Sequence, residues 1–221
     1  MKMKRLFLMA ILFYFPLLLY SSLNMEELCE QVTECVVEVT GTKTKSWFSN
    51  HQRCLQCQGF FLNQDGYVLT DKNVVEDTET VEVQWMDSSG YYYTDSATVI
   101  AMHPTIDVAI LKVDSRSKES AFPSRPLSFE PIPLNSFTFL SYSEMEKNES
   151  FPLMGKVLHI FRSDNIHKVM IAIPTCDGGN GTAIFNVSGE IIGIQTASYV
   201  KNDFVCCLPI FYLEGSNAKQ H

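Results

Sequence analysis

The chain has 221 residues, of which 46% are hydrophobic and 19% are charged. This composition is typical of a globular protein and excludes a disordered chain or a collagen-like repeat. Acidic residues outnumber basic residues by 25 to 17, for a formal net charge of −8, which argues against nucleic acid as a partner because phosphates require a basic surface.

Residues 1–24 are predicted to be a secretory signal peptide that is not part of the fold. Three basic residues within the first five positions precede an unbroken apolar run at residues 6–20, which is the order of regions in such peptides. The run is short for a membrane span and contains Pro16. The expected location is the secretory pathway or the extracellular space. The alternative is an uncleaved anchor through residues 6–20, and only then would the chain contact a membrane.

The next residues predict one short helix and then β-structure. Apolar residues at helical spacing predict an amphipathic helix over Met25–Val36. A strand is expected to begin at Val36, and the polar stretch Lys43–Gln58 predicts a long loop. Two apolar runs within Gly59–Thr70 flank an Asp-Gly turn, which predicts a β-hairpin.

Short apolar runs separated by turn residues continue to the end of the chain. Three of them complete a first unit over about residues 35–114, and a Ser- and Pro-containing linker is expected over 115–126. A second unit is expected over about 127–212, before a polar tail at 213–221. Many short strands with almost no helix predict an all-β protein made of two small barrels or sandwiches. The later strands are expected at Val81–Met86, Tyr91–Ile100, Val108–Val113, Phe137–Tyr142, Gly155–Phe161, Lys168–Ile173, Ala183–Val187, Glu190–Thr196 and Phe204–Leu208.

The seven cysteines allow up to three disulfides and one remaining thiol in an oxidising compartment, with the connectivity left open. Adjacent cysteines in a strand point to opposite faces, so Cys206 and Cys207 are not expected to pair with each other. His51, Cys54 and Cys57 have the spacing of part of a zinc site, but no fourth ligand is evident, so neither a metal nor a cofactor is expected. The cysteines are Cys29, Cys35, Cys54, Cys57, Cys176, Cys206 and Cys207.

Three segments appear in an order that carries a resemblance. Gly66–Val75 has the sequence G-Y-V-L-T-D-K-N-V-V, Asp107–Val113 has D-V-A-I-L-K-V, and Asp177–Thr196 contains G-G-N-G-T followed by S-G-E-I-I-G-I-Q-T. Together they resemble the HtrA/Deg (protease Do-like) serine proteases over roughly residues 35–210. This resemblance implies the trypsin fold, in which two six-stranded barrels enclose a cleft, here after a short N-terminal helix. Family members usually carry a C-terminal PDZ domain, which is not expected here because no room for it follows residue 212.

The resemblance also implies that the catalytic triad is degenerate. The family's general-base histidine falls on Asn73 and its nucleophilic serine on Asn180, while its aspartate is retained as Asp107. Gly178 and Asn180 match the positions whose N–H groups form the oxyanion hole. An amide is neither a base near neutral pH nor an acyl-transfer nucleophile, so a polar but inert network of Asp107, Asn73 and Asn180 is expected. His103 and Cys176 are interpreted as turn and structural residues, not as replacements.

The resemblance implies a binding cleft even without catalysis. The segment Gly193, Ile194, Gln195, Thr196 and Ala197 matches the strand that lines the substrate edge and the specificity pocket. Backbone pairing with an extended ligand survives side-chain changes, so the expected partner is an extended peptide or protein segment. The sequence leaves the oligomeric state undetermined. Three N-glycosylation sequons begin at Asn148, Asn180 and Asn186.

The favoured function is therefore a secreted, inactive serine protease homologue that binds a peptide or protein. One alternative is an active serine-type endopeptidase of the HtrA/Deg type. The other alternative is a degenerate copy with no retained activity.

Overall fold

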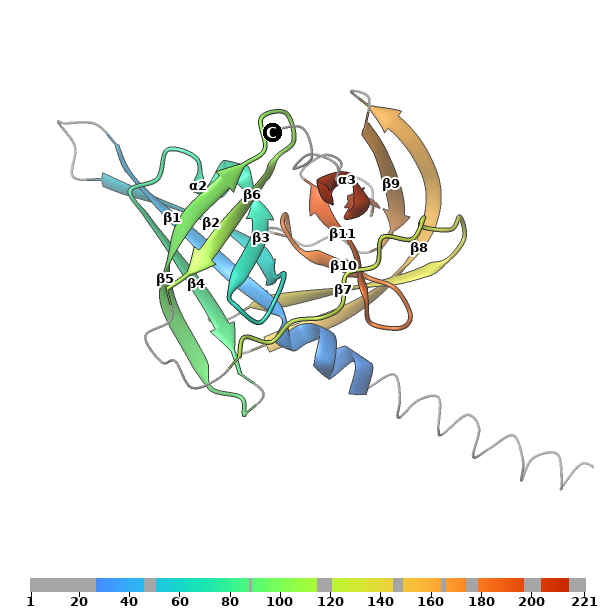
Figure 1. Ribbon diagram of the computed structural model, residues 1–221, viewed down its shortest axis with the longest axis horizontal. Helices are drawn as coiled ribbons and strands as arrows, with labels where there is room; N and C mark the ends of the chain where they lie inside the picture. Colours follow the sequence, from blue (N-terminus) through green and yellow to red (C-terminus); the bar gives the residue numbers. More distant parts are fainter. Residues whose placement is uncertain are drawn as a thin grey trace, which may run out of the picture.

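The structure, a computed structural model, describes residues 27–45, 51–87, 89–114, 121–144, 149–163, 166–173, 179–196 and 204–214. Two closed six-stranded antiparallel barrels follow each other along the chain (Figure 1). The predicted all-β double barrel is therefore confirmed. The described residues contain no helix long and apolar enough to cross a membrane, and the predicted signal peptide lies outside them.

The first barrel has the strand order β1-β2-β3-β6-β5-β4. Its interior is filled by alternate apolar side chains, with the Trp85 ring packed edge-on against Phe61 at 5.8 Å between centroids. The single-turn helix α2 (Lys72–Val75) follows β3. The strands are β1 (Val36–Lys45), β2 (His51–Phe61), β3 (Tyr67–Asp71), β4 (Thr80–Met86), β5 (Tyr92–Met102) and β6 (Val108–Val113).

The predicted hairpin is confirmed, whereas the predicted loop over Lys43–Gln58 is wrong for most of its length. In the hairpin turn, the Asn63 side chain accepts a hydrogen bond from the Asp65 N–H at 3.1 Å, and Gly66 has a φ of +85°. In place of the loop, β1 and β2 pair from Val36 opposite Phe60 out to Lys45 opposite His51. Polar residues such as threonine suit an exposed pair of strands, and hydrophobic patterning does not detect such a pair.

The second barrel has the strand order β10-β11-β12-β9-β8-β7. Its interior is formed mainly by aliphatic side chains such as Leu140, Ile184 and Val205. The short helix α3 (Phe211–Glu214) follows β12. The strands are β7 (Phe137–Glu144), β8 (Glu149–Ser163), β9 (Ile166–Ala172), β10 (Ala183–Phe185), β11 (Ile191–Thr196) and β12 (Phe204–Pro209).

A third apolar cluster, the interbarrel cluster, joins the two barrels. Residues 27–34 are helical, as predicted, and lie beside both barrels (Figure 1). On this helix, the Thr33 hydroxyl lies 2.7 Å from that of Ser141 on β7. The interbarrel cluster consists of Val32, Cys35, Val36, Phe60, Leu69, Ile106, Val108, Phe139, Ala183, Phe185, Ile191, Ile194, Leu208 and Ile210.

The segment between the barrels is more than a connection. Within the predicted linker, residues 115–120 lie outside the described residues, but Phe122 is buried in the first barrel. Its ring centroid lies 4.7 Å from that of Phe61 and 5.1 Å from that of Trp85. Composition alone does not show this contact, because a single aromatic residue within a polar stretch leaves no periodic signal.

Candidate functional site

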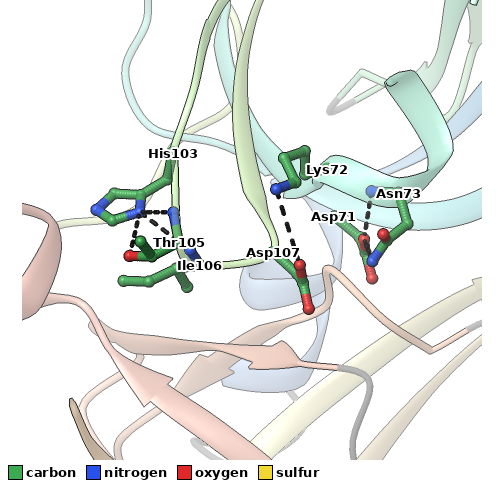
Figure 2. A network of polar contacts seen from close by, with 7 residues as sticks. All are labelled: Asp71, Lys72, Asn73, His103, Thr105, Ile106 and Asp107. Atoms are coloured by element: carbon green, nitrogen blue, oxygen red, sulfur yellow. Dashed lines mark hydrogen bonds and ion pairs between the residues drawn. The ribbon is translucent and has the colours of Figure 1, made fainter. Parts of the chain in front are cut away.

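Asn73, which the resemblance matches to the family's histidine, lies at the start of α2. Asp71 caps this helix, and its Oδ1 accepts hydrogen bonds from both the backbone N–H of Asn73, at 2.8 Å, and the side-chain Nδ2 of Asn73, at 2.9 Å. An aspartate is a favoured N-cap because its carboxylate satisfies helix N–H groups that have no other partner. Figure 2 shows the Asn73 amide turned toward Asp71. The side chain at the histidine position is therefore held by its own neighbour.

Asp107, which the resemblance matches to the family's aspartate, lies beside a different residue, Lys72. Its carboxylate lies 4.0 Å from the Lys72 ammonium and is 54% exposed, while its carbonyl oxygen accepts a hydrogen bond from the Lys72 backbone N–H at 3.3 Å. The expected contact between Asp107 and the Asn73 amide is therefore wrong, because that amide donates to Asp71. The carboxylates of Asp71 and Asp107 both lie near Asn73, and the Asn73 amide donates to Asp71, which is only two residues away in the sequence.

His103 supports the turn that carries Asp107. Its Nδ1 accepts hydrogen bonds from the Thr105 N–H at 3.2 Å and the Ile106 N–H at 3.1 Å (Figure 2). Partial burial and then the nearby Lys72 charge lower the pKa of His103, which favours the neutral ring that accepts these bonds. The interpretation of His103 as a turn residue agrees with this geometry.

Asn180, which the resemblance matches to the nucleophilic serine, lies in the turn before β10 and is half-buried. Its carbonyl oxygen accepts a hydrogen bond from the Gln58 N–H at 2.9 Å. Gly181 follows with a φ of +86°, and a Cβ there would clash with the Gln58 carbonyl oxygen and lie 3.2 Å from the Asp71 nitrogen. The structure therefore brings the Asn180 turn against β2 and the end of β3, next to the segment that carries Asn73.

The predicted binding strand is only partly available as an edge. Gly193 and Ile194 in β11 pair with β10 on one side and with β12 on the other. The Gln195 N–H donates to Thr182 and its carbonyl accepts from Gly181, while β12 lies on its other side. The prediction of a free edge is therefore wrong for these three residues, because β11 is an interior strand of a closed barrel. Thr196 remains at the end of the strand, and its buried hydroxyl has no hydrogen-bond partner among the described residues.

Several predicted site residues lie outside the described residues, namely Gly178, Ala197, Cys176 and the sequon residue Asn148. Sequence reasoning missed a buried polar pair beside this region: the Tyr142 hydroxyl donates to the Gln195 side-chain oxygen at 3.0 Å. The sequence did offer a signal for this pair, because Gln195 follows an apolar run in β11. A buried amide requires a hydrogen-bond partner, so a polar side chain was to be expected near it.

Four of the described cysteines do not form the disulfides that the sequence allows. Cys35, Cys54, Cys57 and Cys207 form no disulfide in the described part of the chain. Burial raises the pKa of the Cys35 and Cys57 thiols to about 12, and it raises the pKa of Cys207 as well. Cys54 is exposed and Cys57 is buried, so they point to opposite faces of β2 and cannot bind one zinc ion together.

The sequon residue Asn186 has a clear local role in the turn between β10 and β11. Its side-chain oxygen accepts hydrogen bonds from the Ser188 N–H at 2.9 Å and the Glu190 N–H at 3.0 Å. Its amide donates to the Glu190 carboxylate at 2.7 Å. These bonds are typical of an asparagine that stabilises a tight turn.

Removing the cap at Asp71 tests the arrangement around Asn73. We expect Asp71→Ala to lower the free energy of unfolding by about 1–2 kcal/mol at neutral pH, because the helix N–H and the Asn73 amide lose their acceptor. Asp71→Asn keeps a side-chain oxygen and is the matched control, with an expected loss of less than about 0.5 kcal/mol. Urea denaturation measures both values, and equal losses would contradict the capping role.

The same residue gives a pH dependence with a defined sign. Burial raises the pKa of Asp71, the Asn73 hydrogen bonds lower it, and the nearby Asp107 charge raises it further. The folded state therefore holds this proton more tightly than the unfolded chain, whose pKa is about 3.9. The resulting stabilisation is present below that pKa and is lost as the pH rises through the folded value. Relative to wild type, Asp71→Asn should therefore gain stability as the pH rises from acid to neutral, which urea denaturation of both proteins over this range measures.

Comparison with known proteins agrees with this fold. A family model described as the trypsin-like peptidase domain matches residues 57–194, which is more than half of the chain. The chain therefore belongs to the trypsin-like peptidase domain family. The solved structure of Deg5 covers 88% of this chain, and the match covers 92% of Deg5, with a TM-score of 0.73 at 16% identity. The active form of the Rv3671c protease from M. tuberculosis has a TM-score of 0.70 at 18% identity, over 87% of this chain and 83% of its own.

The similarity to the HtrA/Deg proteases is confirmed by curated relatives. A "Probable periplasmic serine endoprotease DegP-like" of Chlamydia pneumoniae is 27% identical over 156 residues, which cover 63% of this chain and 28% of the relative. A protein of the same description from Pseudomonas fluorescens is 26% identical over 149 residues, covering 65% of this chain and 29% of the relative. The chain thus spans less than a third of the length of these relatives.

Proposed function

We propose that this chain is a catalytically inactive homologue of the trypsin-like serine proteases that retains a cleft for an extended peptide or protein segment. The observation that carries the proposal is the pairing around the histidine position. The Asn73 amide donates to Asp71, while Asp107 lies beside Lys72. A working triad instead requires an imidazole that is oriented by the aspartate and accepts the nucleophile's proton.

The substitutions remove both reacting groups. A carboxamide has no basic nitrogen near neutral pH, so Asn73 cannot accept a proton from a nucleophile. Asn180 likewise offers no hydroxyl or thiol for attack on a peptide carbonyl. Backbone donors and substrate binding alone give only about 10³–10⁴-fold acceleration over water, which is too little for a useful protease.

The backbone framework of the cleft supports the binding part of the proposal. The Asn180 turn is still held against β2, through the hydrogen bond from Gln58 at 2.9 Å. Since Gly193, Ile194 and Gln195 are paired on both sides, the ligand strand is proposed to begin at Thr196 and to continue along Ala197. Main-chain pairing there does not depend on the lost catalytic side chains.

The proposed location is the secretory pathway or the extracellular space, with residues 1–24 acting as a signal peptide. The basic and apolar order of these residues supports export. The curated relatives are described as periplasmic, which agrees with an exported chain.

Calorimetric titration with a library of extended apolar peptides tests the binding function. We expect micromolar binding, about −8 kcal/mol, because the two residues of the proposed subsite, Thr196 and Ala197, have small side chains. Ala197→Trp should abolish this binding while leaving the unfolding midpoint unchanged. A glycan on Asn180 would occlude the cleft, so the titration is repeated on Asn180→Gln. Absence of binding by both forms would contradict the proposal and leave a degenerate copy as the better account.

A further inference from the structure

Strand β8 extends past its partner in the second barrel. β7 pairs with β8 from Glu149 to Lys156, and β9 pairs with it from Lys156 to Ser163. On the β7 side, the pairing of β8 continues only as far as Val157. The Asn135 N–H donates to the Val157 carbonyl oxygen, and the Val157 N–H donates to the Ser136 carbonyl oxygen. Within the described ranges, residues 158–162 therefore have no strand partner on the β7 side. On the other side, residues 159–162 pair with β9, and Leu158 lies at a β-bulge, where the register shifts between Val157 and His159. We call this stretch the β8 edge, and β8 forms the outer margin of the second barrel in Figure 1.

A strand edge exposes N–H and C=O groups that another extended chain can pair with. Side chains on the β8 edge are also suited to such a contact, because Leu158 is 44% exposed and Ile160 is 38% exposed. The rings of His159 and Phe161 stack on the same stretch, with centroids 6.2 Å apart. Exposed apolar residues at an unpaired edge favour pairing with another extended chain.

The charge around this edge is opposite to that of the whole chain. Residues 150–176 contain three cationic side chains, Lys156, Arg162 and Lys168, and one acidic residue, Asp164. The chain as a whole carries a formal charge of −8. Lys156 and Arg162 are exposed and Lys168 is half-buried, so an incoming acidic segment would meet positive charge here.

We infer that the β8 edge is a second binding site, where an extended protein segment of alternating acidic and apolar residues adds as a strand. Main-chain hydrogen bonds along residues 158–162 would hold the segment. His159 and Phe161, on one face of β8, would contact its apolar side chains, and Arg162, on the other face, its carboxylates. This site is distinct from the cleft of the proposed function, and its ligand differs in charge from the neutral apolar peptides expected there.

The contribution of charge is tested first by fluorescence anisotropy, with a fluorescein-labelled peptide of alternating Glu and Val residues. We expect it to bind about tenfold more tightly than the matched peptide of alternating Lys and Val. Arg162→Glu should weaken binding about tenfold, whereas Lys43→Glu, the same charge change on the first barrel, should leave it unchanged. Equal losses in the two variants would overturn the proposal, because they would indicate only long-range attraction.

The strand geometry is tested by N-methylation of alternate peptide residues in the two available registers. Successive N–H groups of a strand point to opposite sides, so one register removes the bonds to β8 and the other does not. We expect one methylated peptide to lose binding and the other to keep it. Equal binding of both would overturn strand addition.

Two further measurements distinguish the β8 edge from the cleft and from a dimer interface. An unlabelled neutral apolar peptide should not displace the acidic probe, so failure of cleft binding leaves this test intact, and displacement would overturn a separate site. If the probe does not bind and the protein sediments as a dimer that Ile160→Lys dissociates, a second copy occupies the edge and the peptide proposal is wrong. Circular dichroism of each variant confirms that it is folded.

Discussion

The double variant Asn73→His with Asn180→Ser is expected to gain labelling by a fluorophosphonate serine-hydrolase probe, whereas the natural chain is expected to show none. The double variant supplies an imidazole base and a hydroxyl nucleophile together at the two positions that the resemblance assigns to them. Each single variant should remain unlabelled, because triad members act as a unit and losing one costs nearly as much as losing all. Probe labelling on a gel, followed by mapping of the modified peptide, measures this directly.

The structure sharpens this experiment beyond a two-residue exchange. Asp107 lies 4.0 Å from the Lys72 ammonium, which competes with a restored imidazole for its carboxylate. Adding Lys72→Asn to the double variant should therefore raise the labelling rate about tenfold, within the range of general-base effects. Asn73→His with Asn180→Ala is the matched control without a nucleophile. Labelling of any serine in the natural chain would contradict the proposed inactivity.

Gly181→Ala is expected to cause the largest loss of stability of any single change near the site, about 3–5 kcal/mol. Gly181 has a φ of +86°, and a Cβ would meet the Gln58 carbonyl oxygen, a backbone atom that cannot move without distorting β2. The variant would therefore combine backbone strain with separation of the Asn180 turn from the first barrel. Urea denaturation gives the change in the free energy of unfolding.

Gly90→Ala is the matched control for this change. Gly90 has a φ of +81°, but no atom of the described residues lies within 4 Å of the added Cβ. The free energy of unfolding of this variant should fall by only about 1 kcal/mol, which is the cost of placing an alanine in the left-handed conformation. The difference between the two variants isolates the contact between the Asn180 turn and β2. Equal losses would show that this contact contributes nothing to stability.

The fold was predictable because its signals are local and repeated. The Asp-Gly turn at Gly66 and the short apolar runs indicate hairpins and strands without any knowledge of distant contacts. The three family-like segments then fix which positions meet in space, and the structure does bring the Asn180 turn to the segment that carries Asn73.

The predictions that were wrong concern which of several neighbours a residue contacts, and only the three-dimensional structure decides this. Asp71 and Asp107 were both available to Asn73, and only the geometry of the cap at α2 decides for Asp71. The run from Gly193 to Gln195 was interpreted as an edge, although a continuous buried run is typical of an interior strand. Phe122 gave no periodic signal, so its burial in the first barrel was not predictable.

The interbarrel cluster has a consequence for how the molecule unfolds. Phe60 and Leu69 from the first barrel pack together with Phe185 and Ile194 from the second, and all four are at most 1% exposed. A barrel on its own would leave this apolar face in water, which costs about 25 cal/mol for each Å². We therefore expect the two barrels to unfold together as one cooperative unit, because unfolding of one barrel exposes the apolar face of the other. Asn73 and Asn180 do not belong to the cluster, so substitutions at these two positions leave this coupling in place.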